Sequence, residues 1–120
     1  MHKSWTEMTV ELSQALKEVR TGAPDTMHAF SALARAALAP KALDTKTKEL
    51  LALGIAVAVR CDACIAFHAE AAVKHGATRE EIMETMGLAI YMGAGPSAMY
   101  AAQAVEAYDQ FAAKQNQPRG

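Results

Sequence analysis

Residues 45–68 read TKTKELLALGIAVAVRCDACIAFH, and this stretch contains both the most apolar segment of the chain and its two cysteines. After a polar first turn, Leu50–Val59 is apolar on every side of a helix. Such a helix is normally buried on every side, and a chain of 120 residues has little room to bury one. The segment therefore predicts a helix that packs partly against other subunits, and we expect a homo-oligomer.

Helical signals continue on both sides of this stretch. Apolar residues recur with helical spacing, Ser4 with Glu7 and Thr78 with Glu81 are typical of capping boxes, and Gly and Pro residues separate the segments. We predict about six helices, near residues 5–19, 25–38, 45–60, 61–75, 79–92 and 97–113, with a clear break at 93–96.

The composition supports the same fold class. Apolar residues make up 52% of the chain, which excludes general disorder. Much of this share is alanine, the best helix former, whereas the aromatic and β-branched residues that favour strands are sparse. We therefore predict an all-α protein with a single domain over residues 1–120.

Charge and hydropathy limit the partners. The net charge is −1, with acids and bases mixed along the chain, so no basic stripe is available for nucleic acid. The first ten residues lack the apolar run of a signal peptide, and the ten residues of Leu50–Val59 are too few to span a bilayer. We expect a cytoplasmic protein with no membrane association.

The segment Cys61-Asp62-Ala63-Cys64, followed by His68, carries the candidate chemistry. On a helix, positions 61, 64 and 68 share one face. Two thiols one turn apart can form a disulfide, and a helix N-terminus and a nearby imidazole both assist thiolate formation. These are the requirements of a dithiol that cycles between reduced and disulfide forms. Alternatively, His68 only covers a polar edge of the helix.

Glu49 is a fourth candidate residue. It directly precedes the apolar run, and its i+4 neighbour is Leu53, so its face of the helix points partly inward. A carboxyl group drawn into apolar surroundings holds its proton more readily and can pass it on. The alternative is a solvated acid that pairs with Lys46 or Lys48.

The order Glu49, eleven residues, Cys61-x-x-Cys64-x-x-x-His68 and then His75–Ile82 resembles the carboxymuconolactone decarboxylase-like family. More narrowly, it is similar to the cysteine-bearing alkylhydroperoxidase D branch. The resemblance implies an all-helical domain that assembles as a homotrimer or homohexamer. It also implies a thiol-dependent peroxide or disulfide reductase, with electrons supplied by a dithiol protein or a small thiol.

The resemblance also implies a role for each candidate residue. Cys64 would attack the peroxide, and Cys61 would close the disulfide and meet the reductant. His68 and Glu49 would relay protons to and from the thiols.

The sequence departs from the best-characterised branch between the cysteines. That branch has a histidine immediately before its second cysteine, where this chain has Ala63. Asp62 adds a negative charge that disfavours a nearby thiolate. The departure favours dithiol–disulfide exchange over peroxide reduction.

Other functions fit parts of the pattern. One is a non-catalytic redox sensor or scaffold with the same fold. Another is a carboxymuconolactone decarboxylase-type enzyme, although that branch does not rely on such a cysteine pair. Zinc could be held by Cys61, Cys64 and His68 with Glu49 or His75, but structural zinc sites usually use two separated ligand pairs, and the second pair is absent. We predict no metal, and no cofactor because the chain has no P-loop or G-x-G-x-x-G motif.

Overall fold

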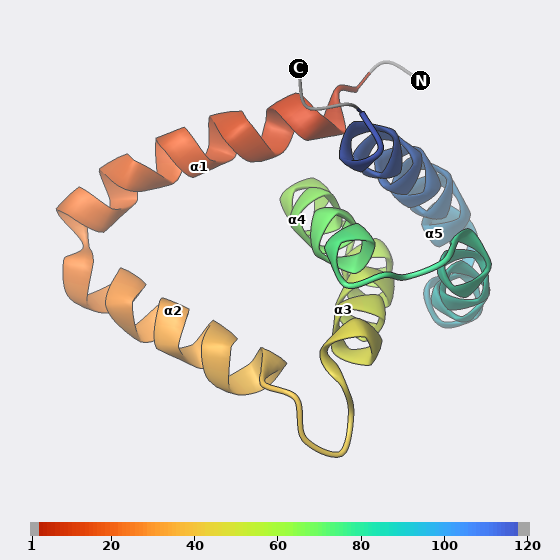
Figure 1. The fold of residues 1–120 in the computed structure, drawn as a ribbon, viewed down its shortest axis with the longest axis horizontal. Helices are drawn as coiled ribbons and strands as arrows, with labels where there is room; N and C mark the ends of the chain where they lie inside the picture. The colour runs from red at the N-terminus through yellow and green to blue at the C-terminus, as the bar shows by residue number, and fades with distance from the viewer. Residues whose placement is uncertain (1–2, 118–120) are drawn as a thin grey trace.

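The computed structural model describes residues 3–117, and this part of the chain forms five helices and no strand. The helices are α1 (Trp5–Gly22), α2 (Pro24–Leu38), α3 (Thr45–Val59), α4 (Asp62–Lys74) and α5 (Arg79–Gln115). The all-α prediction is confirmed. In Figure 1, α3, α4 and α5 form a bundle, while α1 and α2 make an arm that leaves α5 and returns to α3.

Local capping explains where most helices begin. The Ser4 hydroxyl accepts the backbone N–H of Glu7, and Asp44 Oδ1 accepts that of Thr47 at 2.8 Å. At Thr78 the predicted capping box is complete, because Thr78 Oγ1 accepts the Glu81 N–H while Glu81 Oε1 accepts the Thr78 N–H. These contacts satisfy N–H groups that have no partner within the helix.

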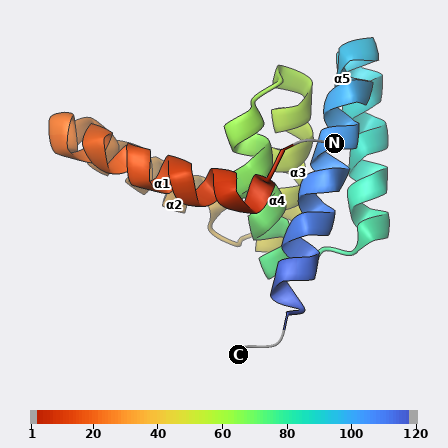
Figure 2. The ribbon, with the colours of Figure 1, turned by 90° about the horizontal axis from the view of Figure 1, so that it is seen from above.

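The fifth and sixth predicted helices form one element, α5, which folds back on itself. A straight helix of 37 residues would be about 55 Å long, whereas the longest extent of the molecule is 38 Å. Figure 2 shows the two halves of α5 running in opposite directions. Arg79 in the first turn donates to Asp109 from Nε and Nη2, at 3.1 and 3.2 Å. The predicted break is present, and the element count is five instead of six.

The turn within α5 requires a glycine and contains a strained alanine. Ala94 has φ 63° and ψ −156°, and a positive φ is uncommon for a residue with a side chain. A Cβ on Gly93 would lie 2.9 Å from Ser97 Cβ and 3.4 Å from the Cα of Ala58 in α3. Gly93 therefore allows the turn to approach α3 closely.

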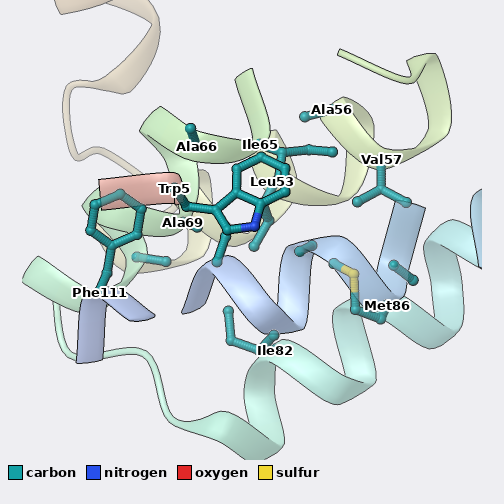
Figure 3. Close-up of a cluster of buried hydrophobic side chains, with 14 of the residues drawn as sticks. Trp5, Leu53, Ala56, Val57, Ile65, Ala66, Ala69, Ile82, Met86 and Phe111 are labelled. Carbon is teal, nitrogen blue, oxygen red and sulfur yellow. The ribbon is translucent and has the colours of Figure 1, made fainter. Parts of the chain in front are cut away.

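The core lies between α3, α4 and α5 and is closed at one end by Trp5. Many of its buried side chains are alanines, which are small enough to let the helices approach closely. The Trp5 indole is fully buried within this cluster (Figure 3), and its Nε1 donates to Glu106 Oε1 at 2.7 Å. The buried alanines are Ala56, Ala66, Ala69, Ala72, Ala77, Ala89, Ala101, Ala104 and Ala107.

The arm packs far less than the bundle. No residue of α2 is buried, and Phe30 and Leu33 are 60% and 64% exposed. Figure 2 shows α1 projecting from the bundle. The helix predicted near residues 25–38 is present, but within a single chain its apolar side chains have little to pack against.

The apolar helix α3 is only half buried. Leu53, Ala56 and Val57 face the core, while Leu51, Ile55 and Val59 are exposed along one side. Burial on every side therefore does not occur within one chain. Among the helices of residues 3–117, none has the length and apolar character needed to cross a membrane.

Candidate thiol site

The cysteine pair lies where α3 gives way to α4. Arg60 ends α3 in the left-handed conformation (φ 63°, ψ 49°) and turns the chain into the next helix. Cys61 is the N-cap of α4, and its Sγ accepts the backbone N–H of Cys64 at 3.3 Å. A sulfur that accepts an N–H at a helix N-terminus is in a position that favours the thiolate. Both cysteines are free thiols.

Glu49 and His68 form a pair that joins α3 to α4. Glu49 Oε1 lies 3.0 Å from His68 Nδ1, and the two side chains are 4% and 28% exposed. Glu49 is therefore buried and not solvated. The lysines that could have paired with it have other partners: Lys46 contacts Glu81 at 2.9 Å, and Lys48 donates to the Ala37 and Ala39 carbonyl groups.

This pair orients the imidazole of His68. When Nδ1 donates to the Glu49 carboxylate, the free lone pair is on Nε2. A carboxylate partner fixes the orientation of the ring, as in other histidine–carboxylate pairs. Since His68 follows Cys64 by four residues on α4, both side chains lie on the same face of the helix.

Cys64 is a strongly perturbed thiol. Its pKa is raised from 9.0 to about 11, chiefly by burial and in addition by the hydrogen bond and the charge of the neighbouring Cys61. At pH 7 a thiol with this pKa is about one part in ten thousand thiolate. A base that accepts its proton is therefore needed for fast reaction at neutral pH.

Sequence reasoning missed Lys3. Its Nζ lies 2.5 Å from Asp62 Oδ2 and donates to Gln103 Oε1 at 2.9 Å. The negative charge expected beside the cysteines thus has a cation against it, supplied from 59 residues away in the chain. One indirect signal existed: the i+3 and i+4 neighbours of Asp62 are Ile65 and Ala66, so its helix offers no basic partner.

His75 lies apart from this arrangement. It is the exposed C-cap residue of α4; its backbone N–H donates to the Ala71 carbonyl group, and the next N–H, that of Gly76, donates to the Val73 carbonyl group. Within residues 3–117, no three His, Cys, Asp or Glu side chains are grouped closely enough to hold a metal ion.

Comparison with known proteins places the chain in a family. The model of the carboxymuconolactone decarboxylase family matches residues 24–107. The crystal structure of a carboxymuconolactone decarboxylase family protein from Legionella pneumophila superposes with a TM-score of 0.87 and 49% identity, covering 90% of this chain and 96% of that one.

Two uncharacterized relatives extend this similarity along the chain. One, from Cupriavidus necator, is 39% identical over 109 residues, which is 85% of this chain and 96% of the relative. The other, from Haemophilus influenzae, is 40% identical over 108 residues, which is 90% of this chain and 96% of the relative. The chain belongs to the carboxymuconolactone decarboxylase family.

Proposed function

We propose that this protein is a thiol-dependent reductase of peroxides or disulfides, and that Cys61 and Cys64 cycle between dithiol and disulfide. The observation that carries the proposal is the 3.3 Å contact between Cys61 Sγ and the Cys64 N–H, with His68 one turn further along α4 and bonded to the buried Glu49 of α3. Two sulfurs within one helical turn are suited to form a disulfide, and the pair supplies a proton acceptor.

The peroxide reaction begins with proton transfer from Cys64 to Nε2 of His68. The thiolate attacks one peroxide oxygen, the O–O bond breaks, and the leaving alkoxide or hydroxide takes the proton back from His68. Cys64 is then a sulfenic acid. The Cys61 thiolate attacks the Cys64 sulfur, the S–O bond breaks, and water leaves with the proton that Cys61 has lost. In sum, one peroxide and two thiols give one alcohol or water, one further water and the disulfide.

A disulfide substrate would follow the same course without the sulfenic acid. Cys64 attacks one substrate sulfur, the substrate S–S bond breaks and the first substrate thiol leaves; Cys61 then attacks the Cys64 sulfur of the mixed disulfide, and the second substrate thiol leaves. In either case a dithiol protein or a small thiol reduces the Cys61–Cys64 disulfide by exchange. We place this cycle in the cytoplasm, because re-reduction needs a compartment that supplies thiols.

We also propose a homo-oligomer, as a trimer or hexamer. Its support is the exposed apolar surface of α3 and α5: Leu51 and Leu88 line one shallow depression, and Ile55, Val59 and Tyr91 are between 62% and 81% exposed. Soluble monomers rarely expose contiguous apolar patches of this kind.

Light scattering should give a multiple of 12.8 kDa, and Ile55→Glu should lower the mass. The control is Ala113→Glu, at an exposed position near the end of α5, which should leave the mass unchanged. A wild-type mass of 12.8 kDa would contradict the assembly.

Turnover measurements test the reaction. Hydrogen peroxide, tert-butyl hydroperoxide and a small disulfide are each offered to the reduced protein, with dithiothreitol as the reductant. We expect turnover of at least one substrate by the wild type and none by the Cys61→Ser/Cys64→Ser variant. A reversible disulfide without turnover would favour a redox sensor. Decarboxylation of carboxymuconolactone that survives in the double variant would favour the decarboxylase instead.

A further inference from the structure

The chain before α1 is held firmly against α5. Trp5 is fully buried, and its backbone N–H donates to Gln110 Oε1 at 2.7 Å. The Gln110 amide in turn donates to the Lys3 carbonyl at 2.9 Å, while the indole donates to Glu106 Oε1. Gln103, Glu106 and Gln110 lie on one face of α5, because they are spaced by three and four residues. This face fixes the backbone on which Lys3 stands.

The fixed backbone directs the Lys3 side chain to the start of α4. Its Nζ lies 5.3 Å from the Trp5 ring centroid, donates to Gln103 Oε1 and contacts Asp62 Oδ2. Lys3 and Asp62 side chains are 39% and 41% exposed. An exposed ion pair of this kind adds little to stability, so stability alone gives no reason for three contacts to converge on one lysine.

The position of Asp62 gives a chemical reason. It follows Cys61 directly and begins the helix whose N-terminus supports the Cys61 sulfur. An unpaired carboxylate there would oppose a thiolate, whereas a paired one would not. Other titratable groups on the elements that meet here are Cys64 and His68 on α4, Glu49 on α3, which contacts His68, and Glu106 on α5, which accepts the Trp5 indole N–H; Arg60 lies at the α3–α4 junction.

We propose that Lys3 is a positioning residue of the dithiol: it neutralises the charge of Asp62, the residue after Cys61, and so keeps Cys61 reactive as a nucleophile. This role rests on the proposed function, because a thiolate at Cys61 matters only if the pair exchanges electrons. It also explains how the chain tolerates an acidic residue between its two cysteines: the negative charge of Asp62 is compensated by Lys3, which lies outside the motif.

Alkylation of Cys61 by iodoacetamide at pH 7 tests the proposal without requiring turnover. All proteins carry Cys64→Ser, so that Cys61 is the reacting thiol. We expect Lys3→Met to slow alkylation by about two- to fivefold and Asp62→Asn to accelerate it by a similar factor. The Lys3→Met/Asp62→Asn variant should return close to the starting rate, and Lys3→Arg should keep it.

Two controls separate charge from structure. Lys74→Met makes the same change in net charge at the other end of α4 and should leave the rate unchanged. Trp5 is the single tryptophan, so an unchanged fluorescence maximum shows that the segment stays docked. The proposal is overturned if Lys3→Met matches Lys74→Met, or if the double variant remains as slow as Lys3→Met. Absence of turnover in the wild type would contradict the proposed reductase but would leave this rate comparison intact.

Discussion

Two acid–base pairs flank the dithiol, and they differ in their access to water. Glu49 and His68, 3.0 Å apart, hold a carboxylate that is only 4% exposed. Lys3 and Asp62 lie at the start of α4 with about two fifths of each side chain in solvent. Charge interactions are strong where water is excluded and are screened where it is not. The buried pair is therefore suited to proton transfer, and the exposed pair to adjusting a rate.

The two pairs also differ in what their loss would leave behind. Removing His68 strands a buried carboxylate, a change that typically costs about 3–5 kcal/mol unless the group takes up a proton. Removing Lys3 leaves Asp62 in contact with water, which solvates it at little cost. Substitution of the two pairs should thus produce effects of different size on the same dithiol.

Removing the dithiol itself should give the largest effect, since both pairs are proposed to act through it. Cys64→Ser is expected to abolish turnover, because no other thiol has the Glu49–His68 pair one turn away. Cys61→Ser should react once with peroxide and stop as a sulfenic acid on Cys64. Mass spectrometry after one equivalent of oxidant would show a gain of one oxygen in Cys61→Ser and a loss of two hydrogens in the wild type. If Cys64→Ser retains the first reaction and Cys61→Ser loses it, the two roles are exchanged.

Breaking the buried pair should give the next largest effect. His68→Gln and Glu49→Gln are expected to slow turnover by roughly 10²–10⁴-fold, the usual contribution of a general acid–base group. Steady-state rates at several pH values would measure this loss. The matched controls are His75→Gln at the exposed end of α4 and Glu84→Gln on the exposed side of α5. Equal losses in the controls and in the pair would show that the buried pair has no special part in the reaction.

The two pairs also mark how far the sequence can predict this site. Helix bounds followed from local signals, such as the caps at Ser4 and Thr78, because capping joins residues three apart. The spacing of Cys61 and Cys64 with His68 is local in the same way. Glu49 could be connected to His68 only through the family resemblance, since helix spacing does not say which faces of two helices meet.

The exposed pair and the arm were beyond such reasoning. Lys3 meets Asp62 because Trp5 docks on α5, a contact between residues about a hundred positions apart that no periodicity signals. Likewise, the sequence predicts the helix near residues 25–38, yet nothing in the sequence shows that no residue of α2 is buried within its own chain. Tertiary packing decides both features.

The raised pKa of Cys64 should make the stability of the protein depend on pH. Its pKa is raised from 9.0 to about 11, so the folded protein keeps the proton over a range where the unfolded chain has lost it. The contribution to stability is therefore complete below about pH 9 and is lost as the pH rises towards 11. The free energy of unfolding, measured with urea on the reduced proteins, should fall more between pH 8 and pH 10.5 for the wild type than for Cys64→Ser. Parallel declines in both proteins would contradict the raised pKa.

The smallest expected effect is a response to salt, and it should distinguish the pairs most directly. The Debye length falls from about 10 Å at 0.1 M to about 3 Å at 1 M ionic strength, which screens exposed charges and leaves buried ones largely unaffected. In proteins that carry Cys64→Ser, the ratio of the alkylation rate of the parent to that of Lys3→Met should approach one in 1 M sodium chloride. In the protein with both cysteines, the turnover deficit of Glu49→Gln should persist at the same salt concentration. If salt restored Glu49→Gln instead, the Glu49–His68 pair would be accessible to ions in solution, and its buried position would not account for its role.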